Sequence, residues 1–122
     1  MAYTRSIAGL ILGALRAARG VTQSTIAEEC GRSPSYISNW ENGDIDIPNR
    51  LIGVYAKHSD VPEQEIWDLI DLWQKEYDEY FRREGNSLFY ESFKRTLFGQ
   101  LRHRYYREPL NPRTRRDLGR KI

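Results

Sequence analysis

The sequence predicts an all-α protein, in which a five-helix domain is followed by a helical extension, and three observations lead to this prediction. Residues that cap and stop helices divide the first half of the chain into short segments. Apolar residues recur every three or four positions through most of the second half. Hydrophobic residues make up 39% of the 122 residues, which is enough for a small packed core.

The first two helices are each marked by a capping residue and a following glycine. Ser6 is expected to cap a helix that runs to about Arg19. Gly20 is expected to end it with a positive φ, which is unfavourable for residues that carry a Cβ. Thr22 is expected to cap a second helix over residues 23–30, which a further glycine ends.

Ser33 and Pro34 together indicate the start of a third helix. Serine is a favourable N-cap, and proline is tolerated at the first helical position because its missing N–H would have no partner there. This helix is expected to run to about Glu41, and Asn42 and Gly43 are expected to end it.

Three further helices are predicted by proline positions and apolar periodicity. Pro48 opens a fourth helix to about His58, and a fifth begins near Pro62. The apolar stripe of the fifth continues almost to Gly85, and a sixth helix is expected over about residues 88–107. The fifth helix presents Ile66, Leu69, Ile70, Trp73, Tyr77, Tyr80 and Phe81, and the sixth presents Tyr90, Phe93, Leu97, Leu101 and Tyr105.

The predicted helices divide the chain into three parts. Residues 1–70 are expected to form a compact domain, and residues 71–107 a helical extension appended to it. Residues 108–122 are rich in arginine and poor in apolar side chains, so they are expected to form a flexible basic tail.

Charge is unevenly distributed, although the net charge is only +2. Residues 1–62 carry six basic and six acidic side chains, residues 63–84 three basic and eight acidic, and residues 85–122 ten basic and three acidic. Asp44 and Asp46 follow the third helix closely. The pattern indicates a neutral domain, an acidic helix and a basic arm.

One set of residues in the first half has the spacing of a known family. The set is Leu12, Leu15, Arg16, Gly20, Val21, Thr22, Gln23, Ile26, Ala27, Gly31, Ile37, Trp40, Glu41, Asn42, Gly43, Pro48 and Leu51. This part of the chain resembles the Cro and lambda-repressor class of helix-turn-helix domains, also called the xenobiotic-response-element family. The resemblance covers roughly half of the chain, and it implies a five-helix domain that binds double-stranded DNA.

The resemblance also implies roles for individual residues. Arg16 and Glu41 match a partly buried ion pair that ties the first helix to the end of the third. Gln23 and Asn42 match two phosphate contacts, and Asn39 is placed to bond an adenine edge in the major groove. The DNA-binding residues expected on this basis are Gln23, Arg32, Ser33, Pro34, Ser35, Tyr36, Ser38, Asn39 and Asn42.

The apolar stripe beyond residue 70 predicts a homodimer. A projecting helix cannot leave so large an apolar surface in water, and a second copy of the last two helices would complete a four-helix arrangement. A dimer would also read two half-sites one helical turn apart in a palindromic operator. The interface residues expected are Trp73, Tyr77, Tyr80, Phe81, Tyr90, Phe93, Leu97 and Leu101.

We therefore expect a sequence-specific transcriptional regulator, a repressor, in the cytoplasm of a bacterium or encoded by a phage. The sequence contains no catalytic motif, metal-ligand spacing or membrane-length apolar run, so no enzyme activity, cofactor, metal or membrane contact is expected. Two alternatives use the C-terminal helices to bind a protein partner: an antitoxin, and a protein that contacts RNA polymerase. A further alternative is RNA binding through the arginine-rich tail.

Overall fold

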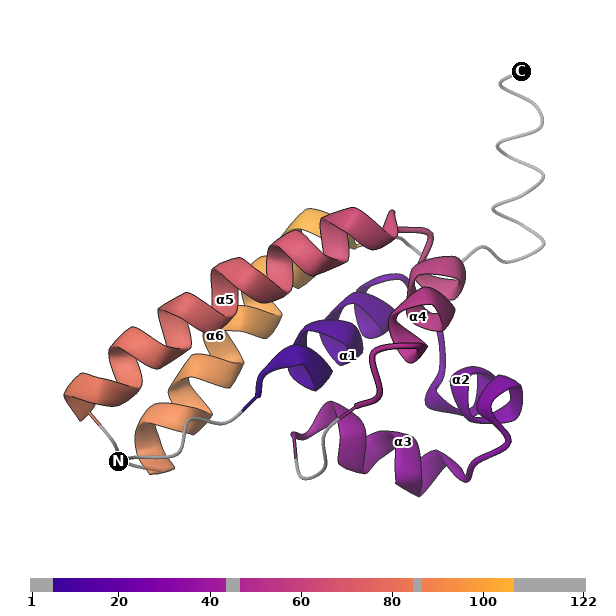
Figure 1. Ribbon diagram of the computed structural model, residues 1–122, viewed down its shortest axis with the longest axis horizontal. Helices are drawn as coiled ribbons and strands as arrows, with labels where there is room; N and C mark the ends of the chain where they lie inside the picture. Colours follow the sequence, from indigo (N-terminus) through magenta and orange to yellow (C-terminus); the bar gives the residue numbers. More distant parts are fainter. Residues whose placement is uncertain (1–5, 44–46, 85–86, 107–122) are drawn as a thin grey trace, which may run out of the picture.

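The computed structural model describes residues 6–43, 47–84 and 87–106, which form six α-helices and no strand (Figure 1). The helices are α1 (Ala8–Ala18), α2 (Gln23–Cys30), α3 (Pro34–Glu41), α4 (Leu51–Ser59), α5 (Glu63–Glu84) and α6 (Ser87–Tyr105). The predicted all-α class is confirmed. None of these helices has both the length and the hydropathy needed to cross a membrane. The predicted basic tail, residues 108–122, and the acidic pair Asp44 and Asp46 lie outside the described residues.

Two of the predicted capping residues begin their helices as expected. The Thr22 hydroxyl accepts a hydrogen bond of 3.2 Å from the backbone N–H of Thr25 at the start of α2. The Ser33 hydroxyl accepts one of 3.3 Å from the backbone N–H of Tyr36, and Pro34 is the first residue of α3. Each bond satisfies an N–H group that has no partner within its helix.

The start of α1 differs from the prediction. Ile7, rather than Ser6, is the residue that precedes the helix, and no side chain caps it. Ile7 is fully buried, and its backbone N–H donates to the Gln74 side-chain oxygen of α5 at 3.0 Å. The chain thus enters α1 from the core, where a distant glutamine holds the residue before the helix, and the cap expected at Ser6 is not formed.

The start of α4 also lies further along the chain than predicted. Pro48 precedes a turn, in which the Leu51 N–H donates to the Pro48 carbonyl at 2.9 Å, and α4 begins at Leu51. The helix ends at Ser59, and Asp60, which follows it, has a positive φ of 55°. Proline therefore marks the turn that leads into the helix and not its first residue.

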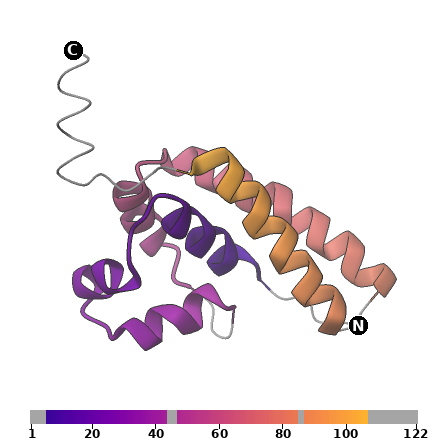
Figure 2. The same ribbon diagram turned by 180° about the vertical axis from the view of Figure 1, so that it is seen from behind.

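Helix α1 lies at the centre of the molecule. On one side it contacts α3 and α4, and α2 packs against both of these helices. On the other side α5 and α6 form an antiparallel pair, and α6 runs beside most of α1 (Figure 1 and Figure 2). The chain after α5 thus turns back toward the first helix.

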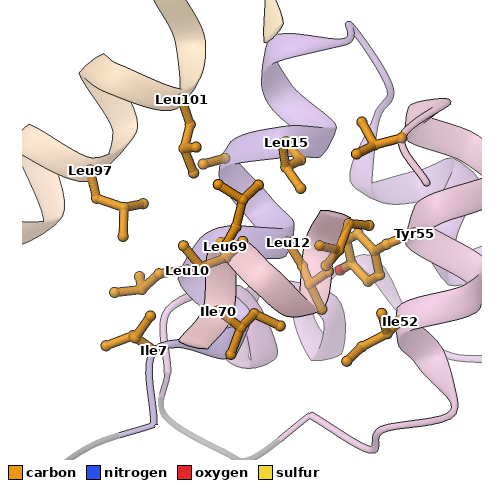
Figure 3. Close-up of a cluster of buried hydrophobic side chains, with 14 of the residues drawn as sticks. Ile7, Leu10, Leu12, Leu15, Ile52, Tyr55, Leu69, Ile70, Leu97 and Leu101 are labelled. Carbon is orange, nitrogen blue, oxygen red and sulfur yellow. The ribbon is translucent and has the colours of Figure 1, made fainter. Parts of the chain in front are cut away.

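The returning helix α6 contributes to the same core as the first five helices. Its core-facing side chains are buried at intervals of four residues, and they are Phe93, Leu97, Leu101 and Tyr105. Leu97 and Leu101 point into the cluster that contains Leu10 and Leu69 (Figure 3). The segment expected to be appended to the domain, residues 71–107, therefore shares one continuous core with it as far as it is described.

Candidate nucleic-acid interface

Helices α2 and α3 form a helix-turn-helix unit with a tight turn between them. Gly31 in the turn has a φ of 65°, the left-handed conformation that favours glycine. Ile26 and Ala27 of α2 and Ile37 of α3 are buried between the helices and the rest of the domain. The small Ala27 side chain lets the two helices approach, so that one face of α3 remains turned outward.

The outward face of α3 carries most of the residues predicted to contact DNA. Its side chains are exposed at Pro34, Ser35, Tyr36 and Asn39, and half-buried at Ser38. The Asn39 amide makes no hydrogen bond to any part of the chain that the structure describes, so both its donor and its acceptor are available. A short helix with an available amide and a serine is the kind of surface that reads base edges.

Tyr36 is held in place by its neighbours. Its ring packs edge-on against the Trp40 ring, with 5.2 Å between the centroids. The Arg32 guanidinium lies 5.0 Å from the centre of the Tyr36 ring. At an exposed site such a cation–π contact contributes about 0.5–1 kcal/mol, and here it orders two side chains at the start of α3.

A buried carboxylate, Glu41, holds the end of α3. Its two oxygens accept hydrogen bonds of 2.7 and 2.8 Å from the Arg16 guanidinium of α1. Tyr55 of α4 donates a further bond of 2.8 Å, and Gln23 of α2 one of 3.1 Å. Glu41 is 5% exposed, and its burial is offset by these four bonds.

The Glu41 network joins all four N-terminal helices at one point. Arg16 also donates a bond of 2.6 Å to the Val21 carbonyl, which fixes the turn between α1 and α2. Burial and the neighbouring Glu41 carboxylate together raise the pKa of Tyr55 far above its usual value, so its hydroxyl remains a donor. The structure thus brings together Arg16 and Glu41, and it adds Tyr55, which the sequence analysis did not include.

The two predicted phosphate contacts lie at the ends of the helix-turn-helix unit. Gln23 is half-buried at the start of α2, and its amide nitrogen is bonded to Glu41. Asn42 is exposed immediately after α3, where its amide nitrogen donates to the Ser38 hydroxyl at 3.4 Å. Gln23 thus stands at the start of the unit and Asn42 at its end.

Helix α6 reaches the end of α3, a contact that sequence reasoning did not predict. The Tyr90 hydroxyl donates a bond of 2.8 Å to the Asn42 backbone carbonyl, and the Lys94 ammonium lies 3.4 Å from the Asn42 side-chain oxygen. A signal for it was present, because Tyr90 and Lys94 are four residues apart and lie on one face of a helix. This face lies beside the apolar stripe, which is the stronger pattern in the sequence.

The residues predicted to form a dimer interface are distributed over the α5–α6 pair. Four of them are buried within the single chain: Tyr77, Phe93, Leu97 and Leu101. Trp73, Phe81 and Tyr90 are half-buried, and Tyr80 is 45% exposed. The four buried side chains have little surface left for a second copy, because α1 and the contact between α5 and α6 already cover them.

Aromatic rings close the α5–α6 pair away from α1. Tyr77 lies 5.1 Å from Phe93 and 5.8 Å from Phe89 between ring centroids. Trp73 also packs edge-on against Phe93 at 5.8 Å. Each such ring pair contributes about 0.5–1.5 kcal/mol to stability beyond the effect of its buried area. These pairs hold α5 and α6 together where the two helices extend past α1.

The first half of the chain matches a family of known domains. Residues 8–69 match the sequence model of a helix-turn-helix domain family, which is just over half of the 122 residues, and the chain belongs to this family. The comparisons with curated proteins and with solved structures gave no significant match. The matched region begins with α1, includes the Glu41 network and α3, and ends within α5. Membership supports DNA as the partner and a role as a DNA-binding regulator.

Proposed function

We propose that this protein is a sequence-specific regulator of transcription of the Cro and lambda-repressor class, which inserts α3 into the major groove of DNA. The observation that carries the proposal is the outward face of α3, with the available amide of Asn39, on a helix that the buried Glu41 network holds rigidly. A base-reading side chain needs such a fixed support, because displacement of α3 would move every contact together.

Individual contacts follow from this placement. Asn39 bonds the N6 and N7 edge of an adenine, and Ser35 contacts either a donor or an acceptor one turn earlier. Arg32 and the exposed Asn42 lie at opposite ends of α3, where the DNA backbone passes, and bind phosphates. Base contacts by α3 would set the sequence preference, and the phosphate contacts would set the register.

The proposal includes a homodimer that represses a promoter by occupying a palindromic operator. One α3 helix spans only a few base pairs, and two copies related by two-fold symmetry read half-sites one turn apart. Support for a second copy lies in the exposed apolar side chains of α5, Leu72 at 56% and Tyr80 at 45% exposure. Trp73 and Phe81, half-buried on the same helix, would extend this surface.

Selection of bound duplexes from a random pool tests the proposal. We expect enrichment of one short motif, repeated as an inverted repeat with its centres about 10 base pairs apart. Enrichment of a single motif without a repeat would support sequence-specific binding to DNA but contradict the homodimer. A pool that stays random after several rounds would contradict sequence-specific binding altogether.

A further inference from the structure

One face of α6 carries alternating aromatic and basic side chains. They occur at intervals of four residues, and they are Tyr90, Lys94, Phe98, Arg102 and Tyr106. Residues four apart lie above one another on a helix, so these five form a stripe beside the buried stripe of the same helix. The Tyr90 end of the stripe touches Asn42 after α3. We call this set the α6 stripe.

An open groove of about 540 Å³ separates the α6 stripe from the helix-turn-helix unit. Lys94, Phe98, Arg102 and Tyr106 line one wall, and small residues of α1 line the floor. The far wall contains Gln23 and Asn42, the two residues at the ends of the unit. Helices α6 and α1, which both contribute lining residues, lie side by side (Figure 2).

The groove is positively charged. Arg16, Lys94 and Arg102 line it together with one described acid, Glu41, which already accepts four hydrogen bonds. Within residues 6–43, 47–84 and 87–106, no carboxylate pairs with Lys94 or Arg102. The Lys94 ammonium lies 5.8 Å from the Phe98 ring centroid, and the Arg102 guanidinium 5.8 Å from that of Tyr106. The rings hold both cations in place, and the Lys94 ammonium, which donates one bond to Asn42, keeps its other two donors.

The position of the groove indicates what these cations meet. When the second helix of such a unit enters the major groove, the sugar–phosphate backbone passes the ends of both helices of the unit. Gln23 and Asn42 mark those ends; the Lys94 ammonium lies 3.4 Å from the Asn42 side-chain oxygen, and Arg102 lines the same groove eight residues further along α6. The α6 cations therefore lie beside the expected path of the backbone.

We propose that α6 supplies a second set of DNA phosphate contacts, through Lys94 and Arg102, next to Gln23 and Asn42. The inference rests on the proposed DNA-binding function. It accounts for an otherwise unexplained feature, since residues 1–62 have equal numbers of acidic and basic side chains whereas DNA affinity depends largely on phosphate neutralisation.

A DNA strand fits the groove better than a small anion does. Lys94 and Arg102 are eight residues apart, or about 12 Å along a helix. Each cation lies over the ring four residues after it, so the two charges stay apart, and a strand that places a charge at about every 3.4 Å of its axis offers a different phosphate to each. Both contacts are independent of base identity, so they add affinity without changing the sequence preference.

The test is a double variant, Lys94→Gln with Arg102→Gln, bound to the duplex enriched by selection. Affinity is measured by fluorescence anisotropy between about 50 and about 200 mM salt. The matched control is Arg95→Gln with Arg104→Gln, which removes the same charge from exposed positions of α6 outside the groove. Circular dichroism melts show that each variant is folded.

We expect the slope of log affinity against log salt to fall by about 2 for the groove variant, because each neutralised phosphate contributes about 0.9 to that slope. Binding at about 100 mM salt should weaken roughly tenfold on every duplex, and the base preference should remain. Lys94→Arg with Arg102→Lys, which keeps both charges, should retain the wild-type slope.

A groove variant with the wild-type slope, or with no greater change than the control, would overturn the inference while leaving the proposed function intact. Inorganic phosphate that binds the wild type but not the groove variant, with an unchanged DNA salt slope, would assign the groove to a small anion instead. If the wild type bound no duplex in the selection, the proposed function and this inference would both fail.

Discussion

Gly9 of α1 lies directly against the backbone carbonyl of Trp40 in α3. A Cβ atom at Gly9 would lie 1.9 Å from that carbonyl oxygen, and one at Gly13, a turn later, would lie 2.9 Å from a Glu41 carboxylate oxygen. Two glycines on one face of α1 thus allow a close crossing with the end of α3. The Arg16 guanidinium reaches Glu41 because this crossing is close.

Gly9→Ala should therefore destabilise the protein by about 3 kcal/mol, since the new methyl group meets backbone atoms that cannot rotate away. The measurement is urea denaturation. Gly99→Ala is the matched control, because no atom lies within 4 Å of a Cβ at this position in α6. The control should raise stability by roughly 0.5–1 kcal/mol through helix propensity. Equal stability of the Gly9 variant and the wild type would contradict the close crossing.

Glu41→Ala should lower the free energy of unfolding by about 3–5 kcal/mol, because it leaves the Arg16 guanidinium buried without its partner. The Arg16 side chain is 14% exposed, so little water can replace the carboxylate. Glu28→Ala removes an exposed glutamate of α2 and should change stability by less than about 0.5 kcal/mol. Thermal melts that do not separate the two variants would mean that the network adds nothing to stability.

Truncation after Glu84 should unfold the domain or leave it with exposed apolar surface. The reason is that α6 covers α1 with Phe93, Leu97 and Leu101, and truncating one buried leucine to alanine already costs about 2–5 kcal/mol. Truncation after Tyr106 keeps α6 and should melt like the full chain. Circular dichroism and binding of a hydrophobic dye distinguish the two products. A compact, cooperatively melting product that ends at Glu84 would show that α6 is dispensable for the fold.

Tyr105 should make stability depend on pH in the alkaline range. Burial, and next the hydrogen bond to the Glu65 carboxylate of α5, raise the pKa of Tyr105 to about 12. Because this value exceeds the usual value of 10.0, the stabilising contribution is complete below pH 10 and is lost as the pH rises through about 12. Denaturation midpoints measured from pH 8 upward should therefore fall more steeply for the wild type than for Tyr105→Phe. The exposed Tyr106→Phe is the control, and parallel curves for the wild type and Tyr105→Phe would contradict this assignment.

The features of the fold that depend on residues close together in the sequence, such as helix caps, could be predicted. Thr22 and Ser33 begin their helices because capping is a contact between residues three apart, which is visible in the sequence. Pro48 was less informative, because proline suits both a turn and a first helical position. Ser6 is not the cap because the chain enters α1 through the buried Ile7, whose backbone N–H donates to Gln74, 67 residues further along the chain.

The packing partner of α6 could not be predicted from the sequence. Its buried stripe, which includes Leu97 and Leu101, has the same spacing whether it packs on a second copy or on α1 of its own chain. Periodicity shows which face of a helix is apolar but not what covers it. The spacing of the α6 stripe is visible in the sequence, but its role could not be predicted, since Lys94 and Arg102 acquire one only when α6 is placed beside the helix-turn-helix unit.

Base reading by α3 is the central claim, and the affinity of Asn39→Ala for the selected duplex tests it most directly. The change should weaken specific binding by about 1–3 kcal/mol and relax the preference at one base pair in each half-site. Gln100→Ala, which removes an exposed amide from α6, should bind like the wild type. If Asn39→Ala retained both the affinity and the full base preference of the wild type, α3 would not read DNA in the manner proposed.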